Sequence, residues 1–66
     1  MEVTVNNNKQ VLEESSNIQS MIDQLNIDVN GIAIAVNLTV VSKAEWSKTQ
    51  LKENDNITII KATQGG

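Results

Sequence analysis

The clearest hydrophobic pattern in the chain is a helical stripe between residues 16 and 26. Its apolar members fall at i, i+3, i+4 and i+7, with polar residues between them: Ile18, Met21, Ile22 and Leu25. This spacing predicts an amphipathic helix whose apolar stripe packs against another element. Ser16 followed by Gln19 has the spacing of a capping box, so we expect the helix to begin there and to end at Asn26.

An alternation of apolar and polar residues predicts a hairpin at the start of the chain. Val3 and Val5 alternate with polar neighbours, as in a strand with one buried face. Residues 6–9, Asn-Asn-Asn-Lys, form a turn signal because Asn tolerates left-handed backbone geometry. Residues 10–13 then return antiparallel.

Two later segments, residues 32–36 and 57–62, show the same alternation. In each, the β-branched residues at every second position predict a face that points inward. The inward set is Ile32, Ile34, Val36, Ile57 and Ile59. The opposite faces carry Ala33, Ala35, Thr58, Ile60 and Ala62. Residues 38–41 offer a further short extended piece.

The segment between these strands predicts one short helical turn. Ser42 and Glu45 repeat the capping spacing, which favours a helical or 3₁₀ turn that ends near Trp46. We interpret Trp46 as a core residue rather than a binding hot spot, since a lone Trp in a small domain usually covers one edge of the core. Leu51 is expected to anchor the following loop, and residues 52–56 form a polar turn.

The order of elements indicates the fold class. A hairpin, a helix, a strand, a short strand with a helical turn and a last strand predict an α+β protein, with the main helix packed on one face of a mixed β-sheet. This is the β-grasp order, in which the first and last strands lie side by side in the middle and run parallel. We expect residues 1–62 to form a single domain and residues 63–66 to form a flexible C-terminal tail.

Composition narrows the function. The 66-residue chain has neither Cys nor His, carries a formal charge of −3 and contains no Arg among its five basic residues. We therefore expect no metal site, no nucleic-acid partner and, because serine nucleophiles would lack a histidine base, no enzyme activity. No apolar stretch approaches the roughly 20 residues of a membrane span, so a cytoplasmic location without membrane contact is expected.

The chain ends in Gly65-Gly66, directly after the last strand pattern and Thr63-Gln64. Two residues without side chains fit through a narrow slot in another protein and present a terminal carboxylate there. The terminal carboxylate is thus the candidate functional group, and residues 63–65 are the segment expected to thread it into a partner.

With these elements in place, the whole chain resembles the ubiquitin-like sulfur carrier proteins of the ThiS type. The resemblance rests on residues 21–25, 33–37, 41–46 and 51–57 together with the terminal glycines: MIDQL, AIAVN, VSKAEW and LKENDNI. The family usually has Gly where Asn54 stands and often Pro where Ser42 stands. Asn adopts left-handed geometry readily, and Ser is a good capping residue, so neither departure conflicts with the fold.

The resemblance implies a mechanism. A ThiF-like adenylating enzyme would use its own ATP and magnesium to convert the Gly66 carboxylate to an acyl-adenylate, while the carrier itself binds no cofactor. A sulfur-donating protein would then supply the sulfur of a thiocarboxylate, and a ThiG-like thiazole synthase would receive it in thiamin biosynthesis. Gly65, Gln64 and Thr63 would lie in the partner's channel.

The pattern also predicts a partner surface, and the resemblance in fold and ending leaves three alternative functions open. Ala33, Ala35, Ile60 and Ala62 would form a small, flat apolar face opposite the helix, suited to docking; incidental surface residues would give the same pattern. The chain could instead be a small subunit of molybdopterin synthase, a ubiquitin-like covalent modifier, or an interaction module whose terminal glycines have no role.

Overall fold

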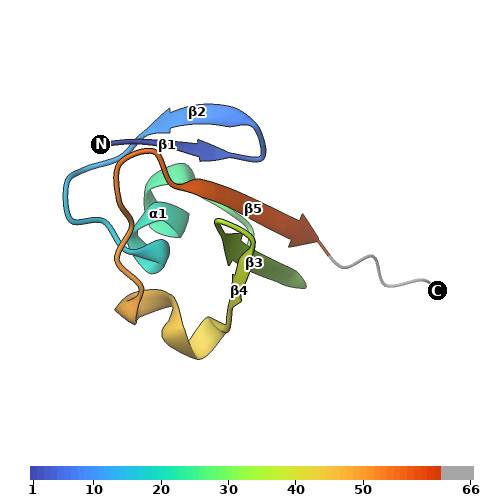
Figure 1. The fold of residues 1–66 in the computed structure, drawn as a ribbon. Coiled ribbons are helices and arrows are strands. Elements are labelled where there is room, and N and C mark those ends of the chain that lie inside the picture. The colour runs from blue at the N-terminus through green and yellow to red at the C-terminus, as the bar shows by residue number, and fades with distance from the viewer. Residues whose placement is uncertain (62–66) are drawn as a thin grey trace.

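The computed structural model describes residues 1–61, which form a five-stranded sheet and two helical segments. The strands follow the order β2-β1-β5-β3-β4 across the sheet (Figure 1). Their bounds are β1 Glu2–Val5, β2 Asn8–Val11, β3 Ile32–Val36, β4 Thr39–Val41 and β5 Asn56–Lys61.

The central pair of strands, β1 and β5, is parallel, and the other neighbouring pairs are antiparallel. Thr4 lies beside Asn56 and Val5 beside Ile57 in this register. The Asn6 side chain extends the pairing, because its Oδ1 accepts a hydrogen bond of 2.8 Å from the backbone N–H of Ile59. The predicted α+β class and β-grasp topology are confirmed.

Both hairpins of the sheet close through two-residue turns. Val5 pairs with Asn8 across Asn6-Asn7, and Val36 pairs with Thr39 across Asn37-Leu38. All four turn residues have positive φ, between 49° and 75°, as a type I′ turn requires. The predicted turn at residues 6–9 is therefore too long, and the return strand begins two residues earlier than expected. Leu38, predicted to begin a strand, lies in the second turn.

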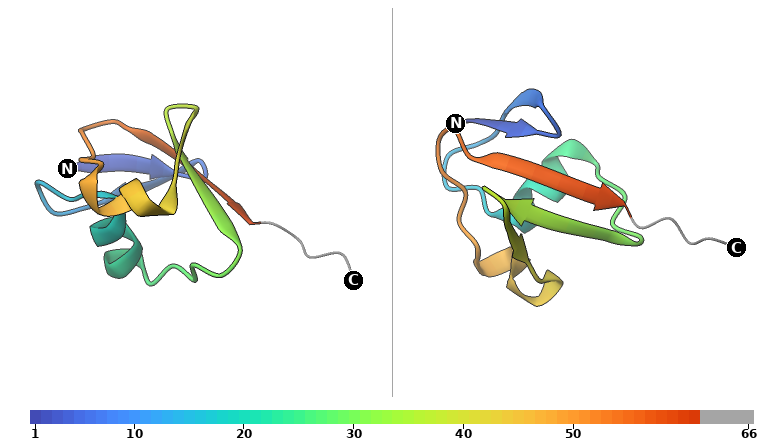
Figure 2. Two further views of the ribbon diagram at one scale, coloured as in Figure 1. Left: turned by 90° about the horizontal axis from the view of Figure 1, so that it is seen from below. Right: turned by 45° about the vertical axis from the view of Figure 1, so that its right-hand side comes forward.

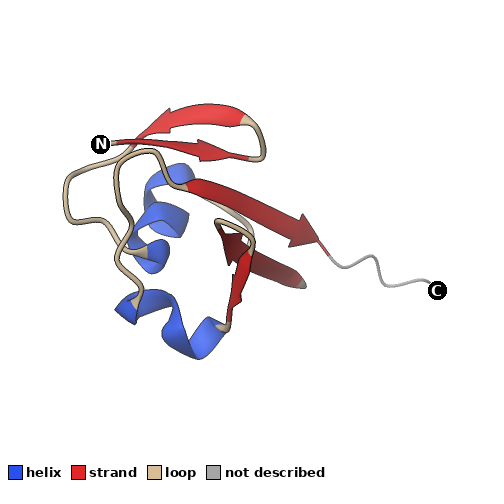
Figure 3. Ribbon diagram, viewed as in Figure 1, coloured by secondary structure: helices blue, strands red, loops and turns tan. Residues whose placement is uncertain are grey.

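The main helix, α1, spans Ile18–Leu25 and lies against one face of the sheet (Figure 3). Its cap is Asn17, whose Oδ1 accepts from the Ser20 N–H at 2.8 Å, so the predicted start at Ser16 is wrong. Ser16 is instead buried and lies outside the helix, where its carbonyl accepts from the Leu51 N–H at 2.9 Å. Asn26 ends the helix in left-handed geometry, as predicted.

The second helical segment, η1, is a 3₁₀ helix over Lys43–Lys48, two residues longer than predicted. Ser42 precedes it but makes no side-chain capping bond, which corrects the predicted role, because the turn is closed by the backbone N–H of Glu45 donating to the Ser42 carbonyl at 2.9 Å. Trp46 is 2% exposed, and its Nε1–H donates to the Val41 carbonyl at 3.0 Å. Its interpretation as a core residue is confirmed.

The core lies between α1, η1 and the inner face of the sheet. An eight-residue helix is marginal alone, so burial of its apolar stripe is what holds α1 in place. Leu51 anchors the loop before β5, as expected. The buried cluster consists of Val3, Val5, Leu12, Ile18, Met21, Ile22, Ile34, Trp46, Leu51 and Ile57.

A polar clamp ties the β3–β4 turn to the start of β5. The Asn37 Nδ2–H donates to the Asp55 carboxylate at 2.9 Å, and its Oδ1 accepts from the Asn56 N–H at 2.9 Å. Asp55, 8% exposed, also accepts from the Lys52 N–H at 2.8 Å. The clamp thus fixes where the turn lies and where β5 begins.

Asn37→Ala is expected to lower the free energy of unfolding by about 2–4 kcal/mol. The change removes two hydrogen bonds, and it replaces Asn, which tolerates positive φ, by Ala, which does not. Asn7→Ala is the matched control. Asn7 has a φ of 69° and makes no side-chain hydrogen bond within residues 1–61, so it should lose only the conformational part, about 1 kcal/mol. Urea unfolding of both variants measures the difference; equal losses would show that the clamp adds nothing.

Candidate functional site

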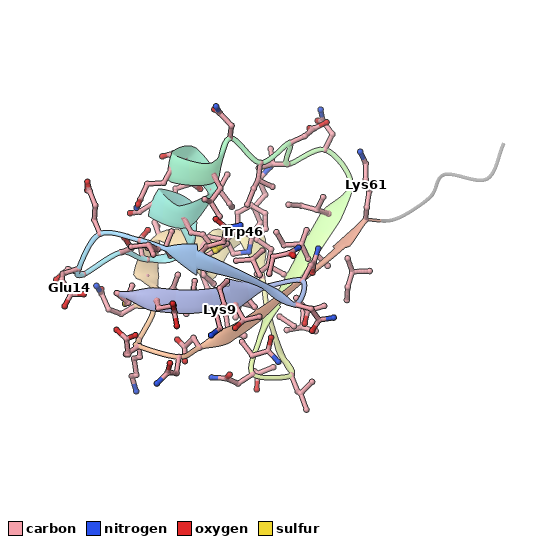
Figure 4. All side chains as sticks on the ribbon, turned by 90° about the horizontal axis from the view of Figure 1, so that it is seen from above. Lys9, Glu14, Trp46 and Lys61 are labelled. Atoms are coloured by element: carbon pink, nitrogen blue, oxygen red, sulfur yellow. The ribbon has the colours of Figure 1, made fainter. Side chains whose placement is uncertain are left out.

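The candidate reactive group is the terminal carboxylate of Gly66, which follows β5 in the sequence. β5 lies between β1 and β3, and its last residue, Lys61, pairs with Ile32 at the first position of β3. Lys61 lies at the opposite end of the molecule from Glu14 (Figure 4). The predicted site residues beyond it, Ala62, Thr63, Gln64, Gly65 and Gly66, lie outside the described residues.

Pairing on both sides fixes the direction in which β5 leads the chain out. Along the face of β5 that points to the core, Ile57 is fully buried, Ile59 is half-buried and Lys61 is exposed, so the strand passes from the core to the surface. Gly66 is the fifth residue after Lys61 in the sequence. A fully extended chain of that length spans at most about 17–18 Å, which sets the depth of any partner channel that the terminal carboxylate could reach.

The sheet face opposite α1, here called the outer face, brings together the described members of the predicted partner surface. Ala33 pairs with Ile60, and residues directly opposite in an antiparallel pair project to the same side of the sheet. Ala35 belongs to the same face through its pairs with Thr58 and Val40, but it is 5% exposed and contributes little surface.

Val40 and Leu38 are exposed apolar residues that the sequence did not assign to this surface. Val40 is 66% exposed and Leu38 is 89% exposed. The alternation in residues 38–41 does not say which side chains face outward, because the register of a three-residue strand is set by its partner. The pair Ala35–Val40 supplies that register.

The outer face has two electrostatically different halves. Over β5, β3 and β4 every outward position is uncharged: Ala33, Ala35, Val40, Asn56, Thr58 and Ile60. Over β1 and β2 the outward positions include Glu2 beside Val11 and Lys9 beside Thr4. The uncharged half includes the outward positions of β5, the strand that leads to the C-terminus.

Other kinds of site find little support in the described part of the chain. Residues 1–61 contain no pocket and no group of three or more His, Cys, Asp or Glu side chains placed to share a metal ion. None of the helices described for these residues combines the length and hydropathy needed to cross a bilayer.

Fold and site together define a class. The fold is that of a ubiquitin-like β-grasp protein: a mixed sheet with parallel central strands and one helix across its inner face. In the sequence, the last strand is followed by a diglycine C-terminus, as is typical of this class. The ThiS family model matches residues 1–66, and the chain belongs to the ThiS family.

Solved structures agree with the fold. The chain is similar to the crystal structure of a thiamine biosynthesis protein (ThiS) from Geobacter metallireducens, with a TM-score of 0.87, 22% identity and full coverage of both chains. A solution structure of a thiamine biosynthesis protein from the same organism gives a TM-score of 0.76 at 22% identity, covering 100% of this chain and 88% of the other. No curated protein sequence matches the chain.

Proposed function

We propose that this protein is a sulfur carrier of thiamin biosynthesis that works through its C-terminal carboxylate. The observation that carries the proposal is the ThiS family match over the whole chain, which includes the terminal diglycine that follows β5. The same match favours thiazole formation over the molybdopterin synthase alternative. The protein acts in a soluble assembly with a ThiF-like adenylating enzyme, a sulfur-donating protein and a ThiG-like thiazole synthase.

The first step activates a poor electrophile. A carboxylate oxygen of Gly66 attacks the α-phosphorus of ATP held with magnesium by the adenylating enzyme, and pyrophosphate leaves. A sulfur nucleophile at the oxidation level of hydrosulfide then attacks the acyl carbon and displaces AMP, leaving a thiocarboxylate. Thiazole synthase takes that sulfur into the ring: the acyl carbon–sulfur bond breaks, and an oxygen atom from water or from the substrate takes the place of sulfur, which restores the carboxylate of the carrier.

The carrier's contribution is presentation. The uncharged half of the outer face docks on the partner, and β5 directs residues 62–66 toward the partner's reaction centre. Thr63, Gln64 and Gly65 occupy the channel, where the small size of glycine allows the channel walls to approach closely. Ile60, Ala33 and Ala62 supply the apolar docking contacts next to the channel entrance, with Ala35 as their floor.

Gly66→Ala is expected to slow adenylation by roughly tenfold to a hundredfold, because the added methyl displaces the carboxylate from its in-line position beside ATP. ATP–pyrophosphate exchange with the ThiF-like enzyme measures the rate. Lys48→Ala is the control, since Lys48 is exposed on η1, away from the outer face. Circular dichroism should be identical for the three proteins. Equal exchange rates for Gly66→Ala and the wild type would refute the steric argument.

The modifier alternative predicts a different product. A ubiquitin-like modifier would form amide-linked conjugates with lysines of other proteins, visible as a ladder on a denaturing gel after incubation in a cell extract with ATP. The carrier should give no ladder. An interaction module, in turn, would keep its full biological activity without the two terminal glycines, whereas the carrier would lose sulfur loading.

A further inference from the structure

The connection between α1 and β3 contains the only asparagine of the chain that is followed by glycine, Asn30-Gly31. Both residues are exposed, and both lie in a turn outside the helix and the strand. Gly31 has a φ of 66°, in the left-handed region that glycine adopts without steric cost. The pair is therefore open to water on the surface of the protein.

An asparagine side chain can react with the backbone of the residue that follows it. The backbone nitrogen of that residue, after its proton passes to a base in solution, attacks the side-chain amide carbon. Ammonia leaves, and a succinimide ring closes. Water then opens the ring at either carbonyl and gives aspartate or isoaspartate, so the net change consumes water and releases ammonia. A side chain on the following residue obstructs the attack, and glycine, which has none, permits it best.

The hydrogen bonds around Asn30 leave both reacting groups available. Its backbone N–H donates to the Asp28 Oδ1 at 3.0 Å, which holds the turn through an atom that takes no part in ring closure. The Asn30 side chain and the Gly31 N–H make no hydrogen bond with any of residues 1–61. Within the described chain, the attacking nitrogen and the amide that it attacks are thus not held by other contacts.

Other asparagines of the chain show what would protect such a site. The nitrogen that follows Asn26 is occupied, because the Ile27 N–H donates to the Ile22 carbonyl at 3.0 Å. The side chain of Asn37 is held through both of its polar atoms, and the bulky Leu38 comes after it. The turn before β3 has neither kind of protection from residues 1–61.

The turn directly precedes β3 at the point where β5 ends. Ile32, the first residue of β3, pairs with Lys61, and Figure 2 (right) shows the start of β3 next to the end of β5. Isoaspartate continues the chain through its side-chain carboxyl carbon, so it lengthens the backbone by a methylene group. A longer backbone immediately before β3 disturbs the pair from which the chain continues to its C-terminus.

We infer that Asn30-Gly31 is a site of spontaneous deamidation, and that the isoaspartate product loosens the Ile32–Lys61 end of the β3–β5 pairing. Each converted molecule gains a negative charge, because a neutral amide becomes a carboxylate. The inference is independent of the function proposed above, since the reaction needs only this chain and water.

Peptide mass analysis of the full chain, stored at neutral pH for several weeks, tests the site. Trypsin cleaves after lysine, so the peptide 10–43 contains Asn30 and three internal references: Asn17, Asn26 and Asn37. Fragmentation locates the product, which is heavier by the exchange of an amide NH₂ for an OH. Asn30 should convert at least about tenfold faster than each reference, which corresponds to a difference of about 1.4 kcal/mol in the reaction barrier.

Asn30→Gln is the matched variant, because its longer side chain would have to close a larger and slower ring. It should keep the circular dichroism of the wild type and give no product at position 30 over the same period. Equal conversion of the four asparagines in the peptide would overturn the site. Conversion at Asn30 only after unfolding in urea would overturn it as well, because the turn would then be protective.

Hydrogen exchange of the stored protein tests the structural consequence. After quenching, peptides of the isoaspartate and aspartate forms separate on a reversed-phase column. Amides of β3 and of the last residues of β5 should exchange faster in the isoaspartate form alone. Asn30→Asp, which has the added charge but a normal backbone, should exchange like the wild type. Equal exchange in the isoaspartate form and in Asn30→Asp would overturn the loosening.

Discussion

Removal of Gly65 and Gly66 is expected to abolish sulfur loading while the free energy of unfolding stays the same. The truncated chain still ends in a carboxylate, now on Gln64, but its reach is shorter by two residues, about 7 Å, and its last side chain is bulky. Adenylation should fall at least a hundredfold, because a reacting group that misses its position by even about 1 Å loses that much.

Binding and loading should separate in this variant. The outer face is intact, so calorimetric titration into the adenylating enzyme should give a Kd within about threefold of the wild-type value. This ratio corresponds to a difference in binding free energy of less than about 1 kcal/mol. Pyrophosphate release at saturating carrier concentration then reports the loss of chemistry alone. Normal loading of the truncated chain would show that its terminus is not the reacting group.

Ile60→Asp should weaken the adenylating complex at least thirtyfold. Ile60 is half exposed and uncharged residues surround it, so a carboxylate at this position loses its water on docking without gaining a partner charge. The expected loss of binding free energy is about 2 kcal/mol or more, which corresponds to a Kd about thirtyfold higher. Its effect on adenylation should lie in KM rather than kcat, since Ile60 precedes Gly66 by six residues in the sequence and belongs to the docking surface rather than to the reacting group.

Val11→Asp is the matched control for Ile60→Asp. Val11 is 77% exposed on the same side of the sheet, but it lies on edge strand β2 beside Glu2 in the charged half. Both variants should retain the circular dichroism of the wild type, and only Ile60→Asp should lose affinity. Equal losses for the two would mean that net charge, rather than the uncharged half of the outer face, governs docking.

The sequence determined the topology because each element has a local signal. The stripe of α1 and the alternation in β3 and β5 set which faces are buried, and one helix on one face of the sheet is the economical way to enclose so small a core. The exposed tip of the β3–β4 turn was not predicted, since Leu is a poor residue for a left-handed position and nothing in the local pattern places it there.

Element ends were harder to predict, for identifiable reasons. Three consecutive Asn residues all tolerate left-handed geometry, so pairing of Val5 with Asn8 decides which two form the first turn. Ser16 has the right spacing for a cap, but its backbone pairs with Leu51 and its Oγ donates to the Glu13 carbonyl at 2.7 Å. Asn17, one residue later, is the first one free to cap α1.

The candidate site, too, has one part that the sequence predicts and one part that only the structure defines. The proposed reactive terminus can be predicted from the sequence, because its chemistry depends on the identity of two residues, Gly65-Gly66, rather than on packing. The proposed docking surface depends on register: the structure places Ala33 beside Ile60, buries Ala35, and adds Val40 through its pairing with β3. Only the three-dimensional pairing divides the outer face into a charged and an uncharged half.

The most direct measurement is the mass of the C-terminal peptide after incubation with ATP, magnesium, the adenylating enzyme and a sulfur donor. The account predicts a peptide heavier by the exchange of one oxygen for one sulfur, with fragmentation placing the sulfur on the Gly66 carboxyl group and an unmodified peptide when ATP is omitted. A wild-type peptide that keeps both carboxyl oxygens under conditions where the partner enzyme loads another carrier would contradict it.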